Sequence, residues 1–270
     1  MGGRYIVPEQ KSFKFKYRLI MELAKADFKK RLVGSYFGLL WMFVQPVVTV
    51  VIYYMVFTVI GRGQQQAMDG VSYLLWMICG LVPWFFFSES MIGGTNCLLE
   101  YRYLVKKVVF QIELLPMVKI TSAAAVHAFF AFVLLIVSVL FGNYPSVFWI
   151  QIIYYSCCAA ALALAVTKLT SAVAVLFGDM AQVVNIAMQF GMWLTPIMYS
   201  NDQVPWPVVA FILRLNPMYY VAEGYRDALI RGVWFWERPY TIYFWAVTAL
   251  LYLLGSRTFK KLKPHFADVL

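Results

Sequence analysis

Long apolar runs separated by short polar segments fill most of this 270-residue chain. The clearest run, residues 36–60, contains no charged side chain. A helix needs about 20 mostly apolar residues to cross roughly 30 Å of hydrocarbon, and six runs come close to that length or exceed it. They predict an all-α integral membrane protein with six transmembrane helices, at about 36–60, 72–92, 117–141, 147–176, 181–199 and 239–255.

Helical patterns outside these runs predict two further elements. In residues 13–32, apolar side chains recur every three or four positions beside a face of Lys and Arg. This pattern predicts a basic amphipathic helix that lies on the cytoplasmic membrane surface. In residues 204–231, the helix-breaking pair Asn216-Pro217 separates two stretches that are each too short to span. They predict an external re-entrant helical hairpin between the fifth and sixth spans.

Composition and charge support the membrane assignment and indicate an orientation. Hydrophobic residues make up 62% of the chain and charged residues 13%, against about a quarter in a soluble domain. The net charge of +10 is concentrated in residues 1–34, 93–116 and 256–270, which marks one side of a membrane better than a nucleic-acid site. The positive-inside rule then predicts that both termini are cytoplasmic. The expected organisation is a cytoplasmic N-terminal segment (1–35), a six-span transmembrane domain (36–255) and a basic cytoplasmic tail (256–270).

Candidate chemistry is sparse. The chain contains no G-x-x-x-x-G-K-[ST] motif, so it is not expected to bind nucleotide phosphates in the usual way. Its four cysteines and two histidines lack the spacing of metal ligands, and no metal site is expected. Glu89 and Lys168 are the ionisable residues expected at membrane depth. Snorkelling, a mutual ion pair and a transport role would each explain them.

Two other patterns each allow two interpretations. Residues 98–107 mix apolar and charged side chains, which suits either a short docking helix for a soluble partner or a positively charged flank of a span. Aromatic residues, 18% of the chain, gather at the ends of the spans. Most fit interfacial belts, and a minority would suit a pore wall that contacts the C–H faces of sugars.

Seven short motifs follow one another along the chain: Gly34-Ser-Tyr-Phe-Gly-Leu-Leu-Trp41 with Pro46, Cys79-Gly-Leu-Val-Pro-Trp-Phe-Phe-Phe-Ser-Glu89, Leu104-Val-Lys-Lys-Val-Val-Phe110, Leu114-Leu-Pro116, Trp193-Leu-Thr-Pro-Ile-Met-Tyr199, Asn216-Pro-Met-Tyr-Tyr220 and Glu223-Gly-Tyr-Arg-Asp227. In this order, from about residue 12 to the C-terminus, the chain resembles the permease subunit of type-2 ABC exporters of polysaccharide or polyol phosphate.

The resemblance implies a bacterial cytoplasmic-membrane protein that acts as a transport channel and is not itself an enzyme. It implies a homodimer assembled with two copies of a cytoplasmic ATP-binding subunit. The channel would run along the dimer axis. This chain would bind no cofactor, since ATP and Mg belong to the partner. The cargo would be an undecaprenyl-diphosphate-linked glycopolymer such as O-antigen, capsule-like glycan or teichoic acid.

The resemblance also suggests roles for three groups of residues. Those expected to receive the ATPase stroke are Glu100, Tyr101, Arg102, Lys106 and Lys107. Those expected to contact the lipid diphosphate are Lys29, Lys30 and Arg31. Those expected to line or gate the channel are Trp41, Tyr53, Trp84, Trp193, Tyr219 and Tyr220.

Two alternatives from other classes remain open. An ion-coupled secondary carrier would transport without an ATPase and would lose coupling when Glu89 is neutralised. An intramembrane enzyme acting on polyprenyl-linked sugars would need several acidic or histidine side chains converging near the headgroups. The chain offers only scattered candidates of that kind, namely Asp27, Glu100, Glu113 and Asp179.

Overall fold

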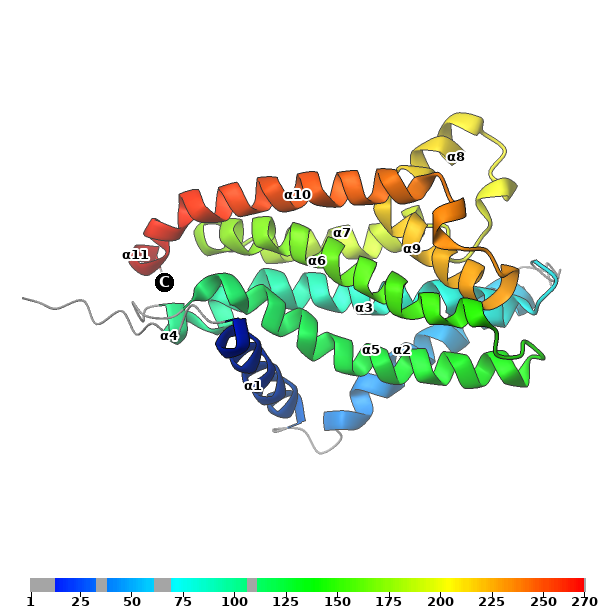
Figure 1. Ribbon diagram of the computed structural model, residues 1–270, viewed down its shortest axis with the longest axis horizontal. Coiled ribbons are helices and arrows are strands. Elements are labelled where there is room, and N and C mark those ends of the chain that lie inside the picture. Colours follow the sequence, from blue (N-terminus) through cyan, green and yellow to red (C-terminus); the bar gives the residue numbers. More distant parts are fainter. Residues whose placement is uncertain (1–12, 33–37, 61–68, 106–110, 270) are drawn as a thin grey trace, which may run out of the picture.

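The computed structural model describes residues 13–32, 38–60, 69–105 and 111–269. Helices form most of these segments, and no strand element occurs among them (Figure 1). The all-α prediction is therefore confirmed for the described residues. The helices run mainly along one direction, and the molecule has two ends. The α4 end carries α4 (Arg102–Val105) and α11 (Phe266–Val269), and the α8 end carries α8 (Pro207–Arg214) and α9 (Pro217–Arg226).

Within these described segments, five helices are long and apolar enough to cross a membrane. They are α2 (Gly38–Tyr54) with the π-helical turn Met55–Ile60, α3 (Tyr73–Glu100), α5 (Leu115–Leu140) with the preceding turn Ile112–Leu114, α6 (Gln151–Leu176) with the preceding turn Val147–Ile150, and α10 (Tyr240–Leu262).

The fifth predicted span, 181–199, is shorter than expected. Helix α7 covers Met180–Leu194, about 22 Å at 1.5 Å per residue, and falls short of a bilayer. It ends because Thr195 precedes Pro196 and adopts an extended conformation (φ −95°, ψ 126°). The turn that follows still reaches the α8 end, where the Tyr73 hydroxyl donates to the Met198 carbonyl at 2.8 Å. The six-span count is therefore not confirmed.

Two helices are longer than predicted, and both extend at the α4 end. Helix α3 continues to Glu100, so residues 98–100 belong to it, and α4 has only four residues. Helix α10 continues to Leu262, so the expected tail begins inside a helix. The tail then turns through Lys263–His265 into α11, whose Phe266 is buried.

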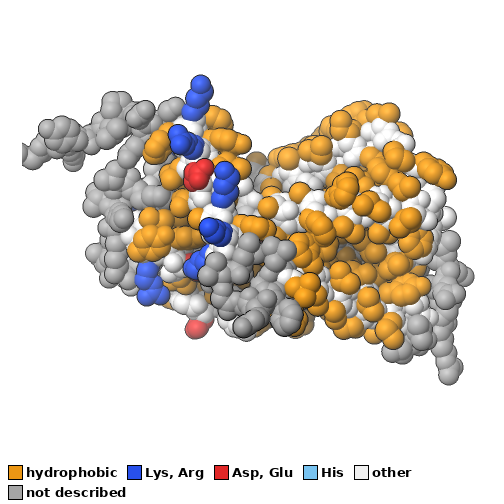
Figure 2. Space-filling view, turned by 90° about the horizontal axis from the view of Figure 1, so that it is seen from below, with side chains coloured by type: hydrophobic (Ala, Val, Ile, Leu, Met, Phe, Trp, Pro, Cys, Tyr) orange, Lys and Arg blue, Asp and Glu red, His pale blue; other side chains and the backbone are white. Residues whose placement is uncertain are grey.

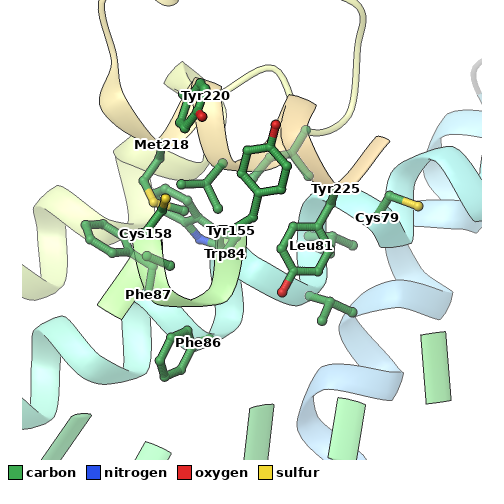
Figure 3. Close-up of a cluster of buried hydrophobic side chains, with 14 of the residues drawn as sticks. Cys79, Leu81, Trp84, Phe86, Phe87, Tyr155, Cys158, Met218, Tyr220 and Tyr225 are labelled. Carbon is green, nitrogen blue, oxygen red and sulfur yellow. The ribbon is translucent and has the colours of Figure 1, made fainter. Parts of the chain in front are cut away.

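The core of the molecule surrounds α3, which packs against α5, α6 and α9. Figure 3 shows aromatic and sulfur side chains of these helices interleaved, among them Trp84 and Tyr155. Helices α6 and α9 approach closely because position 224 is glycine: a Cβ there would lie 2.1 Å from the Tyr155 ring. Helices α6 and α10 meet in the same way at Gly255.

Helices α1 (Phe13–Leu32) and α2 are the least embedded parts of the fold. Helix α1 has the predicted bounds and lies obliquely across the α4 end of α5 (Figure 1). Helix α2 leaves much of its apolar surface uncovered, and the exposed side chains are Leu40, Trp41, Val47, Val48, Val51, Ile52, Met55 and Val56. A chain that spans a membrane would cover this surface with lipid or with another protein.

Candidate functional site

A cavity of about 630 Å³ lies between α1, α2, α3 and α5. Its walls combine apolar side chains with several ionisable ones. The polar lining residues are Asp27, Lys30, Gln45, Thr49, Ser88, Glu89, Glu100, Lys119 and His127. The cavity therefore offers both cationic and anionic groups to a polar ligand, close to the α4 end of the bundle.

An ion network centred on Lys119 forms one wall of this cavity. The Lys119 ammonium donates to Asp27 Oδ1 of α1 and to Glu100 Oε2 at the end of α3, each at 2.6 Å. The Tyr101 hydroxyl donates to the same Asp27 oxygen at 2.8 Å. The side chains of Lys119 and Asp27 are 6% and 3% exposed, and that of Glu100 is 40% exposed. The network thus joins α1, α5 and the last turn of α3.

The electrostatics of Asp27 follow from these contacts. Burial by itself would raise the pKa of this carboxyl. The hydrogen bond and the charge of Lys119 oppose burial and, with the Tyr101 hydroxyl, hold the pKa of Asp27 below its usual value of 3.8. Asp27 is therefore ionised at neutral pH, and α1 is held to α5 by a buried ion pair.

The residues predicted to bind a lipid diphosphate lie on the final turns of α1. Lys29 and Lys30 are exposed, and Lys30 also lines the cavity. The side chain of Arg31 lies outside the described residues. Figure 2 shows that the Lys and Arg side chains on this face gather over α1, whereas the rest of the described face is largely apolar. A charged headgroup near α1 would therefore meet cations at the mouth of the cavity.

The predicted coupling residues lie where α3 ends. Glu100 and Tyr101 belong to the Lys119 network, and Arg102 begins α4 with an exposed side chain. Lys106 and Lys107 lie outside the described residues. Residues 98–100 form the last turn of α3, and α4 follows directly after Tyr101. The described residues 98–105, called the coupling segment here after their predicted role, are therefore continuous with the core helix α3.

The C-terminal helix α11 packs under this coupling segment. Phe266 is 1% exposed and meets Phe259 of α10 edge-on at 5.5 Å. The two rings form one apolar cluster with Cys97, Leu98, Tyr101, Val105, Ile112, Leu115, Ala172 and Val175. The basic tail predicted from the sequence is thus a packed element of the α4 end.

The six aromatic residues predicted to line a channel occupy different environments. Trp41 and Trp193 are exposed, by 58% and 49%. Tyr53 packs edge-on against Trp193, with ring centroids 6.1 Å apart, and so links α2 to α7. Trp84 and Tyr220 are buried inside the protomer, and Tyr219 is half-buried.

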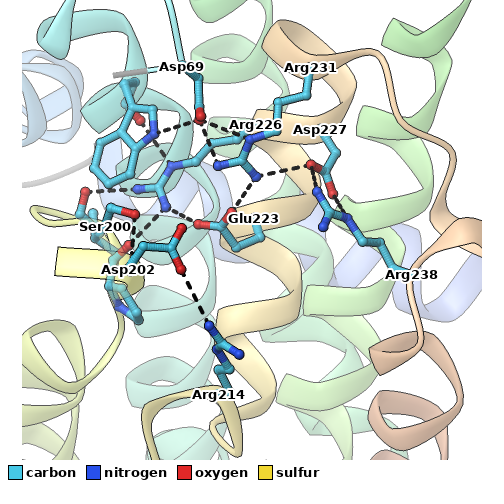
Figure 4. Close-up of polar contacts among 12 residues, drawn as sticks. Asp69, Ser200, Asp202, Arg214, Glu223, Arg226, Asp227, Arg231 and Arg238 are labelled. Carbon is cyan, nitrogen blue, oxygen red and sulfur yellow. Dashed lines mark hydrogen bonds and ion pairs between the residues drawn. The ribbon is translucent and has the colours of Figure 1, made fainter. Parts of the chain in front are cut away.

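A second polar network lies at the α8 end and centres on Arg226, whose side chain is fully buried (Figure 4). Its guanidinium stacks on the Trp76 ring of α3, 3.3 Å from the centroid. It also donates to the carbonyls of Pro196 at 2.9 Å and Ile197 at 3.0 Å, and pairs with Glu223. Arg226 thereby ties α9 to α3 and to the turn after α7.

Arg231 extends this network outward, because it pairs with Glu223 at 2.5 Å, Asp227 at 3.1 Å and Asp69 at 2.7 Å (Figure 4). Arg238 pairs with Asp227 at 2.5 Å. Burial would raise the pKa of Glu223, but Arg226 and Arg231 lower it. The three arginines of residues 226–238 are therefore each paired with a carboxylate.

The two residues predicted at membrane depth lie in different places. Glu89 lines the cavity, whereas the Lys168 ammonium donates to two hydroxyls of α10, Tyr252 at 2.9 Å and Ser256 at 3.3 Å. The pairing of Lys119 with Asp27 was not predicted. The available signal was a lysine inside the predicted span 117–141, which requires a counter-charge, but nothing in the sequence identified the partner 92 positions away.

Comparison with known proteins identifies a family. The model of the ABC-2 type transporter family matches residues 18–230, well over half of the chain. Two O-antigen export system permease proteins, RfbA of Klebsiella pneumoniae, are 25% and 26% identical to it over 96% of this chain and 100% of each relative. RfbA of Myxococcus xanthus is 26% identical over 78% of this chain and 80% of its own length. These matches confirm the family resemblance of the sequence motifs.

Proposed function

This chain belongs to the ABC-2 type transporter family, and we propose that it is the permease subunit of an ATP-driven exporter of a lipid-linked cell-surface glycan. Three relatives that match most of the chain are O-antigen export system permease proteins, which supports an O-antigen-like cargo. A teichoic acid or another polyprenyl-diphosphate-linked polymer has the same headgroup chemistry. We place the α4 end in the bacterial cytoplasm, because Lys and Arg gather in the segments near it.

The observation that carries this proposal is the Lys119 network. It joins the end of α3, where a soluble ATPase would push, to α1 and the cavity, where a charged lipid headgroup would enter. Glu100 accepts a hydrogen bond from Lys119, and Tyr101 donates one to Asp27. A displacement of the end of α3 therefore moves both contacts of the ion pair. Force on the coupling segment is thereby delivered to the cavity wall as well as to the core.

Substrate entry is proposed at the mouth of the cavity. A diphosphate carries several negative charges, and Lys29 and Lys30 offer exposed ammonium groups beside the opening. Arg31, the next residue, completes the proposed cationic group. The apolar walls of α2 and α5 suit the polyprenyl chain of such a lipid.

A homodimer with the channel between its copies is the proposed assembly. The uncovered apolar surface of α2 lies beside that of α7, where Phe190, Trp193 and Leu194 are exposed. Tyr53 and Trp193 join the two surfaces into one. Trp41, Tyr53 and Trp193 are the proposed wall of the channel, whereas Trp84 and Tyr220 act as packing that supports it.

Reconstitution tests this function. The chain and its ATPase are placed in inverted vesicles with a labelled undecaprenyl-diphosphate glycan, and protection of the glycan from an external glycosidase is measured. Transport that requires ATP hydrolysis, and that slows in the double variant Lys29→Gln, Lys30→Gln, is the expected result. Transport without nucleotide that stops in Glu89→Gln would favour an ion-coupled carrier instead.

A further inference from the structure

Lys168 is an ammonium group at membrane depth that contacts neutral groups of α10. Its Nζ donates to the hydroxyls of Tyr252 and Ser256 and lies 4.1 Å from the centroid of the Tyr252 ring. Among the described residues, no carboxylate forms an ion pair with it. An ammonium has three donors and one full charge, so the two hydroxyls leave one donor unused, and the Tyr252 ring offsets the charge only in part.

The depth of Lys168 matches the inner edge of the hydrocarbon layer. The helical unit Val147–Leu176 has 30 residues and is about 45 Å long, so it exceeds a hydrocarbon core of roughly 30 Å by about 7 Å at each end. Lys168 lies about 12 Å from the α4-end terminus at 1.5 Å per residue. Its backbone is therefore roughly 5 Å inside the layer, within the reach of a lysine side chain from the headgroups.

Lys168 lies where α6 and α10 pack closely. Gly255 permits the close approach of the two helices, since a Cβ there would lie 2.8 Å from the Ala165 carbonyl. Tyr252 is 40% exposed, so the polar group formed by Lys168, Tyr252 and Ser256, called the α6–α10 site here, is accessible from outside the protomer. One helical turn beyond Ser256, on the same stripe of α10, the exposed Lys260 adds a second cation nearer the α4 end.

We propose that the α6–α10 site binds the phosphate of an anionic phospholipid of the inner leaflet, with Lys168 as the deep contact and Lys260 as the shallow one. The Lys168 ammonium supplies the charge, and the hydroxyls of Tyr252 and Ser256 supply additional donors to phosphate oxygens. A phosphodiester on a lipid tail suits the site because the acyl chains lie along the exposed apolar face of α10. The inference uses the proposed orientation and is otherwise independent of the cargo.

Native mass spectrometry of the purified full chain tests the site. The protein is titrated with phosphatidylglycerol and, separately, with zwitterionic phosphatidylcholine, and bound lipids are counted. Lys168→Gln is expected to weaken the tightest phosphatidylglycerol site roughly tenfold, because a hydrogen bond to a charged group is lost. Lys168→Arg keeps the charge and retains binding. Lys25→Gln is the matched control, since Lys25 is an exposed lysine of α1.

Three results would overturn the proposal: equal phosphatidylglycerol binding by the wild type and Lys168→Gln, equal losses in Lys168→Gln and Lys25→Gln, or displacement of the lipid by millimolar inorganic phosphate that binds with the same Lys168 dependence. The last result would assign the α6–α10 site to a soluble anion. If Lys168→Gln does not fold, Lys260→Gln and Tyr252→Phe give the same test at exposed positions, with smaller losses expected. Lipid counts do not depend on ATP or glycan, so failure here is distinct from failure of the exporter proposal.

Discussion

Replacement of Lys119 by methionine should release α1 from the bundle. Methionine keeps most of the length of the side chain but removes the ammonium that contacts the buried Asp27 carboxylate at 2.6 Å. Loss of one partner of a buried ion pair costs about 3–5 kcal/mol. The bond to the half-exposed Glu100 adds less than about 1 kcal/mol. Even the lower figure shifts the docking equilibrium of α1 by roughly 100-fold.

The assay for this release is labelling of a cysteine placed at Ala24. That position is 5% exposed in the docked helix, so a maleimide should react slowly with Ala24→Cys and much faster once Lys119 is changed. The exposed native thiol, Cys157, is replaced by serine in the background. Lys263→Met is the matched control because it removes an exposed ion pair with Glu113 at 3.0 Å.

The result that would refute the reasoning is equal labelling of Ala24→Cys in Lys119→Met and Lys263→Met. Faster labelling in both variants would also contradict it, since the exposed pair should contribute little. Addition of Asp27→Asn to Lys119→Met should restore part of the protection, because it removes the buried negative charge that the Lys119 ammonium compensated.

Three other predictions concern packing and pH. Gly224→Ala should reduce the yield of folded protein in size-exclusion chromatography, since its Cβ would lie 2.1 Å from Tyr155, whereas Gly178→Ala, which meets nothing within 4 Å, should not. Phe266→Ala should lower transport per ATP hydrolysed and cost about 3–5 kcal/mol of stability at the α4 end, measured by hydrogen exchange of the coupling segment. The lowered pKa of Glu223 means that its stabilising contribution is complete above its usual pKa of 4.5 and is lost as pH falls through the lowered value. The stability deficit of Glu223→Gln relative to the wild type, measured by thermal unfolding, should accordingly stay constant at every pH above the usual pKa of 4.5 and shrink only in stronger acid.

The local elements of the fold were predictable because their signals are local. The spacing of apolar residues in 13–32 gave the bounds of α1, and Asn216-Pro217 gave the break between α8 and α9. At that break the Asn216 side chain accepts a hydrogen bond from the Met218 amide, as a helix cap does. Pro196 indicated that α7 ends near this residue. The apolar run continues past Pro196, however, and therefore predicted a full span.

The long-range features were not predictable from one sequence. Helix α3 is apolar all round, so no periodic face distinguished the buried Trp84 from an exposed channel residue. Pairing of Lys119 with Asp27, and burial of Arg226 against Trp76, depend on how distant helices pack. Residues 256–270 were interpreted as a topology signal because their basic residues outnumber their two phenylalanines. Phe259 and Phe266 nevertheless pack this segment against the coupling segment.

Affinity purification of the tagged chain from native membranes tests the central claim most directly. We expect a soluble subunit with a Walker A motif to co-purify in equal amount, together with a polyprenyl-linked glycan. The Lys119→Met variant should fail to export this glycan. Purification of the chain alone, with nucleotide-independent transport in liposomes, would contradict it.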